Sequence, residues 1–141
     1  MRSFLDTSVL IAAFLGDHPH HEASAEVFAR AERPRTWCAA HSIAEVYSAL
    51  TRLPLKPAVA PEQALLFLHD VRGRLSAVAL EESEYYHAVE RAAGRQVTGG
   101  RLYDALLLAC AAKIKADTIY TWNLKHFRQL RPDLADRIRT P

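Results

Sequence analysis

Cysteine is scarce in this chain of 141 residues. The two cysteines, Cys38 and Cys110, lie far apart in apolar stretches, where a free thiol behaves as a small hydrophobic side chain. Disulfide-stapled domains need several cysteine pairs, and zinc sites need closely spaced ligands. The cysteine content therefore argues against both a disulfide scaffold and a structural zinc site.

Long apolar runs are also absent. No window approaches 18 uncharged apolar residues, and the first residues, Met-Arg-Ser-Phe-Leu-Asp, lack a charged segment followed by a long apolar one. Repeats and low-complexity tracts are missing too, and half of the residues are hydrophobic. We expect a cytoplasmic protein without membrane contact, whose residues 1–141 form a single domain around one core.

Neither sign of charge is in large excess. The chain has 18 basic and 16 acidic residues, which gives a formal net charge of +2. If Asp6, Glu45 and Asp104 bind a cation, the remaining 18 basic and 13 acidic residues suit a polyanionic partner. The same balance is ordinary for a soluble protein, so charge alone does not distinguish these interpretations.

Strand-like and helix-like segments alternate along the chain. The expected strands are 2–5, 36–40, 76–80 and 118–121, and the expected helices are 9–15, 22–32, 42–53, 62–71, 82–95, 102–112 and 124–130, followed by a basic tail. This order predicts an α/β fold with a mostly parallel central sheet that is covered on both faces. In such folds, ligands bind beyond the carboxyl ends of the strands.

Four polar residues occupy this predicted edge of the sheet. Asp6 follows the first strand, Glu45 lies a turn into the next helix, Asp104 begins the most apolar helix, and Asn123 follows the fourth strand. Each also has a purely structural explanation. Asp6 and Asn123 are good helix N-caps, and Asp104 interacts favourably with a helix dipole. Ser42 and Glu45 have the spacing of a capping box, so only the joint placement indicates a functional site.

Carboxylates gathered at one edge require a positive partner. They repel each other by ~4 kcal/mol per pair at a separation of about 4 Å and an effective dielectric near 20. Oxygen ligands without His or Cys at the matching junctions suit Mg²⁺ or Mn²⁺ rather than zinc. Such an ion polarises a phosphodiester and lowers the pKa of water, which predicts phosphate chemistry.

Three segments of the chain resemble the PIN-domain family, and within it the VapC-type toxins of type II toxin–antitoxin pairs. They are "FLDTSVLIAAF" at the start, "SIAEVYSALTRL" around Glu45 and "GRLYDALLLACAAKIKADTIYTWNLKHF" near the end. The last segment is the most specific, because it joins an Asp-Ala pair in an apolar helix to Thr-x-Asn-x-x-x-Phe. The resemblance covers nearly the whole chain and implies a PIN-like three-layer α/β/α sandwich.

The resemblance also implies a function and roles for individual residues. It implies a Mg²⁺- or Mn²⁺-dependent endoribonuclease that inhibits translation by cutting tRNA or rRNA, forms a homodimer and binds a cognate antitoxin. The implied metal ligands are Asp6, Glu45, Asp104 and Asn123, with Ser8 and Thr121 as supporting hydroxyls. Many relatives have a fourth acid where this chain has Asn123, whose amide adds no charge, so we expect one ion rather than two.

Further residues are candidates for contact with RNA. Those expected near phosphates are Arg101, Lys125, His126 and Arg128, although an ordinary solvated face explains them equally well. The aromatic residues that are candidates for stacking on unpaired bases are Trp37, Tyr47, Tyr85, Tyr86, Tyr103 and Trp122, with core or interface positions as the alternative. The histidines at 18, 20 and 21 lack a regular ligand spacing, so we interpret them as part of a turn.

Three other functions are considered. A non-catalytic PIN-like module that binds RNA or protein would have the same fold, because an intact acidic site does not prove turnover. A metal-dependent phosphatase of the haloacid-dehalogenase type also has Asp after its first strand, but it requires a second Asp where this chain has Ser8. DNA-directed structure-specific nucleases of related fold carry insertions for which 141 residues leave no room.

Overall fold

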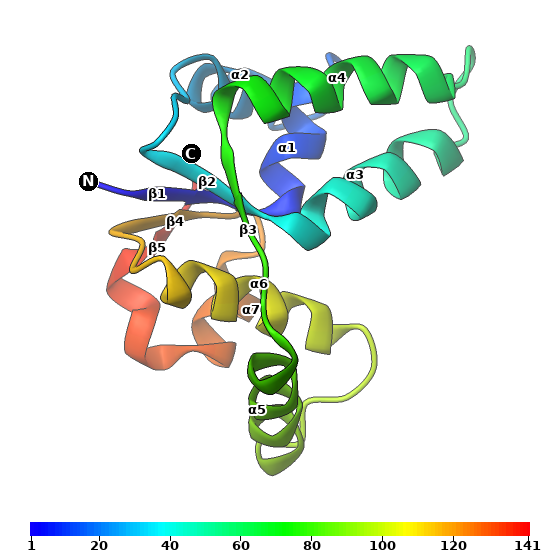
Figure 1. Ribbon diagram of the computed structural model, residues 1–141. Helices are drawn as coiled ribbons and strands as arrows, with labels where there is room; N and C mark the ends of the chain where they lie inside the picture. Colours follow the sequence, from blue (N-terminus) through cyan, green and yellow to red (C-terminus); the bar gives the residue numbers. More distant parts are fainter.

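A five-stranded sheet lies at the centre of the computed structural model, which describes residues 1–141 (Figure 1). The strands are β1 (Ser3–Leu5), β2 (Thr36–Ala39), β3 (Ser76–Val78), β4 (Thr118–Tyr120) and β5 (Ile138–Arg139), in the order β3-β2-β1-β4-β5. All neighbouring pairs are parallel. The expected mostly parallel sheet is confirmed, and it is parallel throughout.

Helices cover both faces of the sheet (Figure 1). One face carries α1 (Thr7–Phe14), α2 (His21–Ala29), α3 (Ala40–Arg52) and α4 (Pro61–Arg74). The other carries α5 (Glu82–Gly94), α6 (Arg101–Lys113), α7 (Leu124–Leu130) and the 3₁₀ helix η1 (Pro132–Arg137). The fold is therefore a three-layer α/β/α sandwich, as expected. None of these helices has the length and apolarity needed to span a bilayer.

The strands are short but buried on both sides. Successive strand residues point to opposite faces, so Phe4 packs against α6 and α7 while Leu5 packs against α1, α3 and α4. Both side chains are fully buried. Cys38 and Cys110 are free and buried in the two opposite clusters, each as a small apolar residue. The sheet thus separates two hydrophobic clusters and is itself shielded from solvent.

The strand order changes direction between β1 and β4. From β1 the chain moves outward through β2 and β3, and it then returns to the other side of β1 with β4 and β5. Leu5 pairs with Tyr120 in register, so the residues that follow, Asp6 and Thr121, emerge side by side. This is the switch point at which parallel α/β sheets bind ligands.

The C-terminal segment differs from the basic tail that we expected. Pro132–Arg137 form η1, and Ile138 and Arg139 form β5, which pairs with β4. Ile138 is fully buried and belongs to the same cluster as Phe4. A two-residue strand is too short to show alternation between apolar and polar residues, so no sequence pattern predicts it.

Candidate active site

Asp6 is a buried carboxylate held by two hydroxyl groups. It occupies the N-cap position of α1, yet its side chain makes no capping hydrogen bond. Its Oδ2 instead accepts a hydrogen bond from Ser8 Oγ at 2.7 Å and one from Thr121 Oγ1 at 2.8 Å. The residue is only 3 % exposed, and no cationic side chain pairs with it. The capping explanation of Asp6 is therefore wrong, and neither hydroxyl occupies Oδ1.

The two hydroxyls that contact Asp6 are themselves fixed by the backbone. The backbone N–H of Trp122 donates to Ser8 Oγ at 3.1 Å, and that of Asn123 donates to Thr121 Oγ1 at 3.0 Å. Each hydroxyl accepts from the chain and must direct its proton to the carboxylate. The segment after β4 thus holds Asp6 in one orientation.

Glu45 projects from α3 toward the start of α1. Its Oε1 accepts a hydrogen bond from Thr7 Oγ1 at 2.8 Å, and Thr7 Oγ1 lies 2.8 Å from Ser42 Oγ. Because a hydroxyl has one proton and a carboxylate only accepts, Ser42 donates to Thr7. Helix α3 begins at Ala40, so Ser42 and Glu45 lie inside the helix, and the predicted capping box is wrong.

Asp104 lies in the first turn of α6 and contacts α7. Its Oδ2 is 2.8 Å from His126 Nδ1, and His126 Nε2 is 2.7 Å from Arg101 Nε. A guanidinium can only donate, so Nε2 accepts and the imidazole proton resides on Nδ1, facing Asp104. In the structure, Arg101 and His126, which we also expect near phosphates, hold this carboxylate in place.

Asn123, Lys125 and Arg128 lie on or next to α7. Asn123 is exposed at the N-cap of this helix and makes no side-chain capping bond, so the capping explanation is wrong for it too. Lys125 is exposed and has no side-chain partner within the chain. Arg128 Nη2 donates to the carbonyl of Ile138 at 2.8 Å, so this arginine anchors β5.

The three acids interact electrostatically. Burial, with a smaller contribution from the charge of Asp104, raises the pKa of Asp6 to about 6 against the lowering effect of the hydroxyls of Ser8 and Thr121. Burial also raises the pKa of Asp104, with an added contribution from the charge of Glu45, while His126 and Arg101 act in the opposite direction. No group of three or more His, Cys, Asp or Glu side chains is arranged so that it could hold a metal ion. Each acid is held by its own donors rather than by a common centre.

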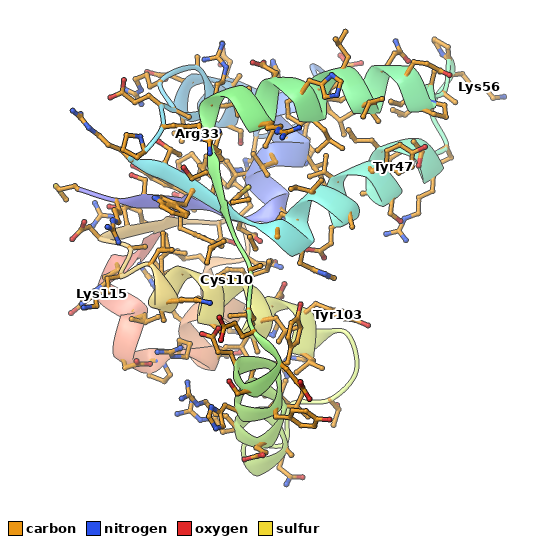
Figure 2. All side chains as sticks on the ribbon, in the orientation of Figure 1. Arg33, Tyr47, Lys56, Tyr103, Cys110 and Lys115 are labelled. Carbon is orange, nitrogen blue, oxygen red and sulfur yellow. The ribbon has the colours of Figure 1, made fainter.

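Two stacked aromatic pairs flank the acids. The ring of His20 lies on the indole of Trp122, with centroids 3.7 Å apart, and His41 stacks on Tyr103 at 5.5 Å. Tyr103 is 49 % exposed, and Figure 2 shows it at the start of α6, in the layer opposite Tyr47 on α3. Tyr47, Tyr85 and Tyr86 are also exposed, whereas Trp37 packs against the core.

Sequence reasoning missed several contacts of the site. The hydrogen bonds of Thr7 and Ser42 at Glu45 were not predicted, although Thr7 lies between Asp6 and Ser8, which were both predicted to belong to the site. The pairing of His20 with Trp122 and of His41 with Tyr103 joins distant segments and has no local signal. The other two histidines of the turn have separate contacts: His21 Nδ1 lies 2.9 Å from the Ala12 carbonyl, and His18 Nδ1 accepts from the His20 N–H.

Comparison with known proteins connects this site to a family. Residues 3–131 match the model of the PIN domain. Two relatives come from Mycobacterium tuberculosis. Ribonuclease VapC40 is 37 % identical over 102 residues, which make up 72 % of each chain. Ribonuclease VapC27 is 35 % identical over 114 residues, which make up 80 % of this chain and 79 % of the relative. The matched part exceeds two thirds of every chain.

Solved structures share the fold at lower identity. The crystal structure of Mycobacterium tuberculosis VapC20, described as a toxin that cleaves the sarcin–ricin loop, superposes with a TM-score of 0.70 at 16 % identity, over 86 % of this chain and 89 % of the other. VapBC2 from Rickettsia felis, solved with a promoter DNA fragment, gives a TM-score of 0.67 at 17 % identity, over 99 % and 98 %. VapBC-1 from nontypeable Haemophilus influenzae gives 0.66 at 18 %, over 99 % and 98 %. The chain belongs to the PIN-domain family and, within it, to the VapC ribonucleases.

Proposed function

We propose that this chain is a metal-dependent endoribonuclease that hydrolyses RNA phosphodiester bonds at the edge defined by Asp6, Glu45 and Asp104. The observation that carries the proposal is the state of Asp6. It is a buried carboxylate with two hydroxyl donors and no cationic side chain beside it. A buried charge without a counter-charge is unfavourable, and a bound cation removes that penalty.

The residues present suit Mg²⁺ or Mn²⁺. The available ligands are carboxylate oxygens and the exposed amide of Asn123, which are the groups that hard divalent ions prefer. Such an ion supplies the positive charge that stabilises phosphodiester hydrolysis and lowers the pKa of water. Coordination requires Glu45 and Asp104 to turn toward Asp6, a change between side-chain rotamers. With three carboxylates and an uncharged fourth position, we expect one ion.

The protein's own groups orient the three acids. Ser8 and Thr121 fix Asp6 through Oδ2, and neither hydroxyl contacts Oδ1. Thr7 holds Glu45, and His126, itself fixed by Arg101, holds Asp104. Outer partners of this kind set the direction and basicity of metal ligands. These partners restrict the orientations of the three acids in the metal-free chain, and Glu45 and Asp104 must still turn toward Asp6 for a common ion to bind.

The surroundings of the acids suit single-stranded RNA. The stacked pairs of His20 with Trp122 and of His41 with Tyr103 present ring faces on which unpaired bases can stack. Lys125, exposed two residues after Asn123, can bind a flanking phosphate. We propose a loop of tRNA or rRNA as the substrate, and inhibition of translation as the result. The name of VapC20, which cleaves the sarcin–ricin loop, supports this substrate class.

We also propose that the chain is the toxin of a toxin–antitoxin pair and forms a homodimer. Helices α3 and α4 expose apolar side chains, namely Ile43, Tyr47, Leu65 and Leu66. Such surface suits burial against another chain. The VapBC complexes among the structural neighbours support an antitoxin as one partner.

Cleavage of cellular RNA by purified, antitoxin-free protein tests the proposed activity. Wild type is compared with Asp6→Asn and Asp104→Asn in Mg²⁺, in Mn²⁺ and in EDTA, and the cut ends are mapped by sequencing. We expect discrete metal-dependent cuts that both substitutions abolish, since a contaminating nuclease would survive them. RNA binding without cleavage by folded, metal-loaded protein would instead indicate the non-catalytic module.

A further inference from the structure

A cavity of about 340 Å³ lies between α5, α6 and the end of α7, on the face of the sheet opposite α3 and α4. Its floor is apolar and flat, because Ala105, Ala109 and Ala112 follow one face of α6. Leu80 and Leu130 complete the apolar wall. None of the three proposed metal ligands, Asp6, Glu45 and Asp104, lines this cavity. Its size and its mixture of apolar walls with a few polar groups are those of a small-ligand site.

Three guanidinium groups gather at one end of the cavity. Arg91 and Arg95 come from α5 and Arg131 from the residue before η1, and all three also line the polar depression beside the cavity. Asp133 is the one acid that lines this depression. Guanidinium groups gathered with a single carboxylate repel one another. An anion with more than one negative charge would relieve this repulsion.

Two of these arginines are held in place and one is free. Arg95 Nη1 donates to the Leu130 carbonyl at 2.9 Å, and Arg131 pairs with both oxygens of Asp133 at 2.9 and 2.8 Å. Arg91 makes no side-chain hydrogen bond or ion pair. A free guanidinium beside two fixed ones presents the fork geometry that binds phosphate through two hydrogen bonds.

The opposite end of the cavity offers groups of another kind. Lys113 Nζ pairs with Glu84 Oε1 at 2.6 Å, and both residues line the cavity with His87. These donors and acceptors suit the heteroatoms of a planar ring that lies on the alanine floor. We propose that this cavity binds a nucleoside monophosphate group, with the phosphate at Arg91 and the base over Ala109. The group is either a free nucleotide or the phosphorylated end of an RNA strand.

Titration of nucleotides into the Asp6→Asn variant in EDTA tests this proposal without interference from cleavage. The probes are the four nucleoside 5′-monophosphates, with inorganic phosphate alone, and binding is followed by calorimetry. We expect saturable binding with one nucleotide per chain. Arg91→Ala should weaken it by about tenfold or more, which is the effect of losing a charge-assisted hydrogen bond. Arg72→Ala is the matched control, because Arg72 is an exposed arginine on α4, in the opposite layer.

Substitution in the cavity floor distinguishes a site that is shaped to bind a nucleotide from attraction between charges alone. Ala109→Leu fills the floor without changing the charge, and we expect it to weaken nucleotides while leaving inorganic phosphate unaffected. Thermal unfolding shows whether each variant is folded, and Ala109→Val replaces Ala109→Leu if the larger side chain is not accommodated. The proposal is overturned if no nucleotide binds saturably, or if Arg72→Ala weakens binding as much as Arg91→Ala does.

Competition with short RNA identifies the source of the nucleotide. A trinucleotide with a 5′-phosphate and the same trinucleotide with a 5′-hydroxyl are titrated against bound monophosphate. Tighter binding of the phosphorylated trinucleotide indicates an RNA end, and tighter binding of the monophosphate indicates a free nucleotide. Both results support a site for nucleotide phosphate, whereas equal displacement by the hydroxyl form contradicts it.

Discussion

At the level of single residues, the carboxylate of Asp6 is buried among hydroxyl groups instead of cationic side chains. Its pKa is raised to about 6, chiefly by burial, although Ser8 and Thr121 both donate to it. A residue selected only for stability would avoid this position, because an unpaired buried charge is unfavourable. A cation site requires the negative charge of this carboxylate. In the metal-free protein, the same charge has a measurable effect on stability.

Replacement of Asp6 by Asn is expected to stabilise the metal-free chain at neutral pH. Folding raises the pKa of Asp6 from 3.8 to about 6, so between these values the folded chain retains a proton that the unfolded chain has lost. The contribution of Asp6 to the free energy of unfolding is thus fully present below about pH 4. It declines by up to ~3 kcal/mol as the pH rises to 6. Urea unfolding in EDTA should show Asp6→Asn more stable than wild type at pH 7.5 and equal to it near pH 4.

The matched control is Asp17→Asn, which removes a carboxylate at an exposed position. It should not reproduce the gain at pH 7.5. If Asp6→Asn proves less stable than wild type at pH 7.5, Asp6 does not carry an unfavourable buried charge in the metal-free chain.

His126 is expected to position Asp104 rather than to contact RNA. Its Nδ1 lies 2.8 Å from Asp104 Oδ2, and Arg101 fixes the other ring nitrogen. His126→Ala should lower the affinity for Mn²⁺ and the rate of cleavage by about 10- to 100-fold, as is usual for partners of metal ligands. His126→Asn, whose amide can replace the Nδ1 donor, should recover part of the loss. Equal loss in both variants, with unchanged Mn²⁺ affinity, would contradict the positioning role.

At the level of elements, the order of strands and helices is predictable from the sequence, whereas the side-chain contacts at their junctions are not. The apolar runs of β1, β2 and β4 and the helices after them were all foreseen, because hydrophobic periodicity is a local signal. The capping explanations of Asp6 and Asn123 were wrong, since neither side chain caps its helix. The capping box of Ser42 and Glu45 failed because the N-cap of α3 is Ala39, three residues before Ser42. Which hydroxyl reaches which carboxylate depends on the register between β1 and β4, which no local pattern encodes.

The unforeseen strand β5 is expected to contribute to stability. Ile138 is fully buried in the cluster with Phe4, and its carbonyl accepts a hydrogen bond from Arg128. Ile138→Ala should lower the free energy of unfolding by roughly 2–5 kcal/mol, the usual range for such a truncation in a core. Arg139→Ala, at the exposed neighbouring position, should change it by less than about 0.5 kcal/mol. A similar small effect of both substitutions in urea unfolding would mean that β5 is not part of the stable sheet.

At the level of the whole molecule, the fold brings residues from four separate segments to one edge. Asp6 follows β1, Glu45 lies on α3, Asp104 on α6 and Asn123 after β4, at the switch point of the sheet. The apolar side chains of α3 and α4 and the arginine-lined cavity beside α5 are separate surfaces. The proposed catalytic edge, the proposed association surface and the proposed nucleotide site thus lie in separate regions of one chain.

Calorimetric titration of Mn²⁺ into metal-free protein tests most directly whether the acidic edge is a cation site. Because each acid is held by different donors, the loss of one ligand should not disturb the fold around the others. We predict one Mn²⁺ per wild-type chain, and loss of this binding in both Asp6→Asn and Asp104→Asn, with Asp17→Asn unchanged. Failure of the folded wild type to bind Mn²⁺, or unchanged binding in the two variants, would contradict the assignment of this edge as the metal site.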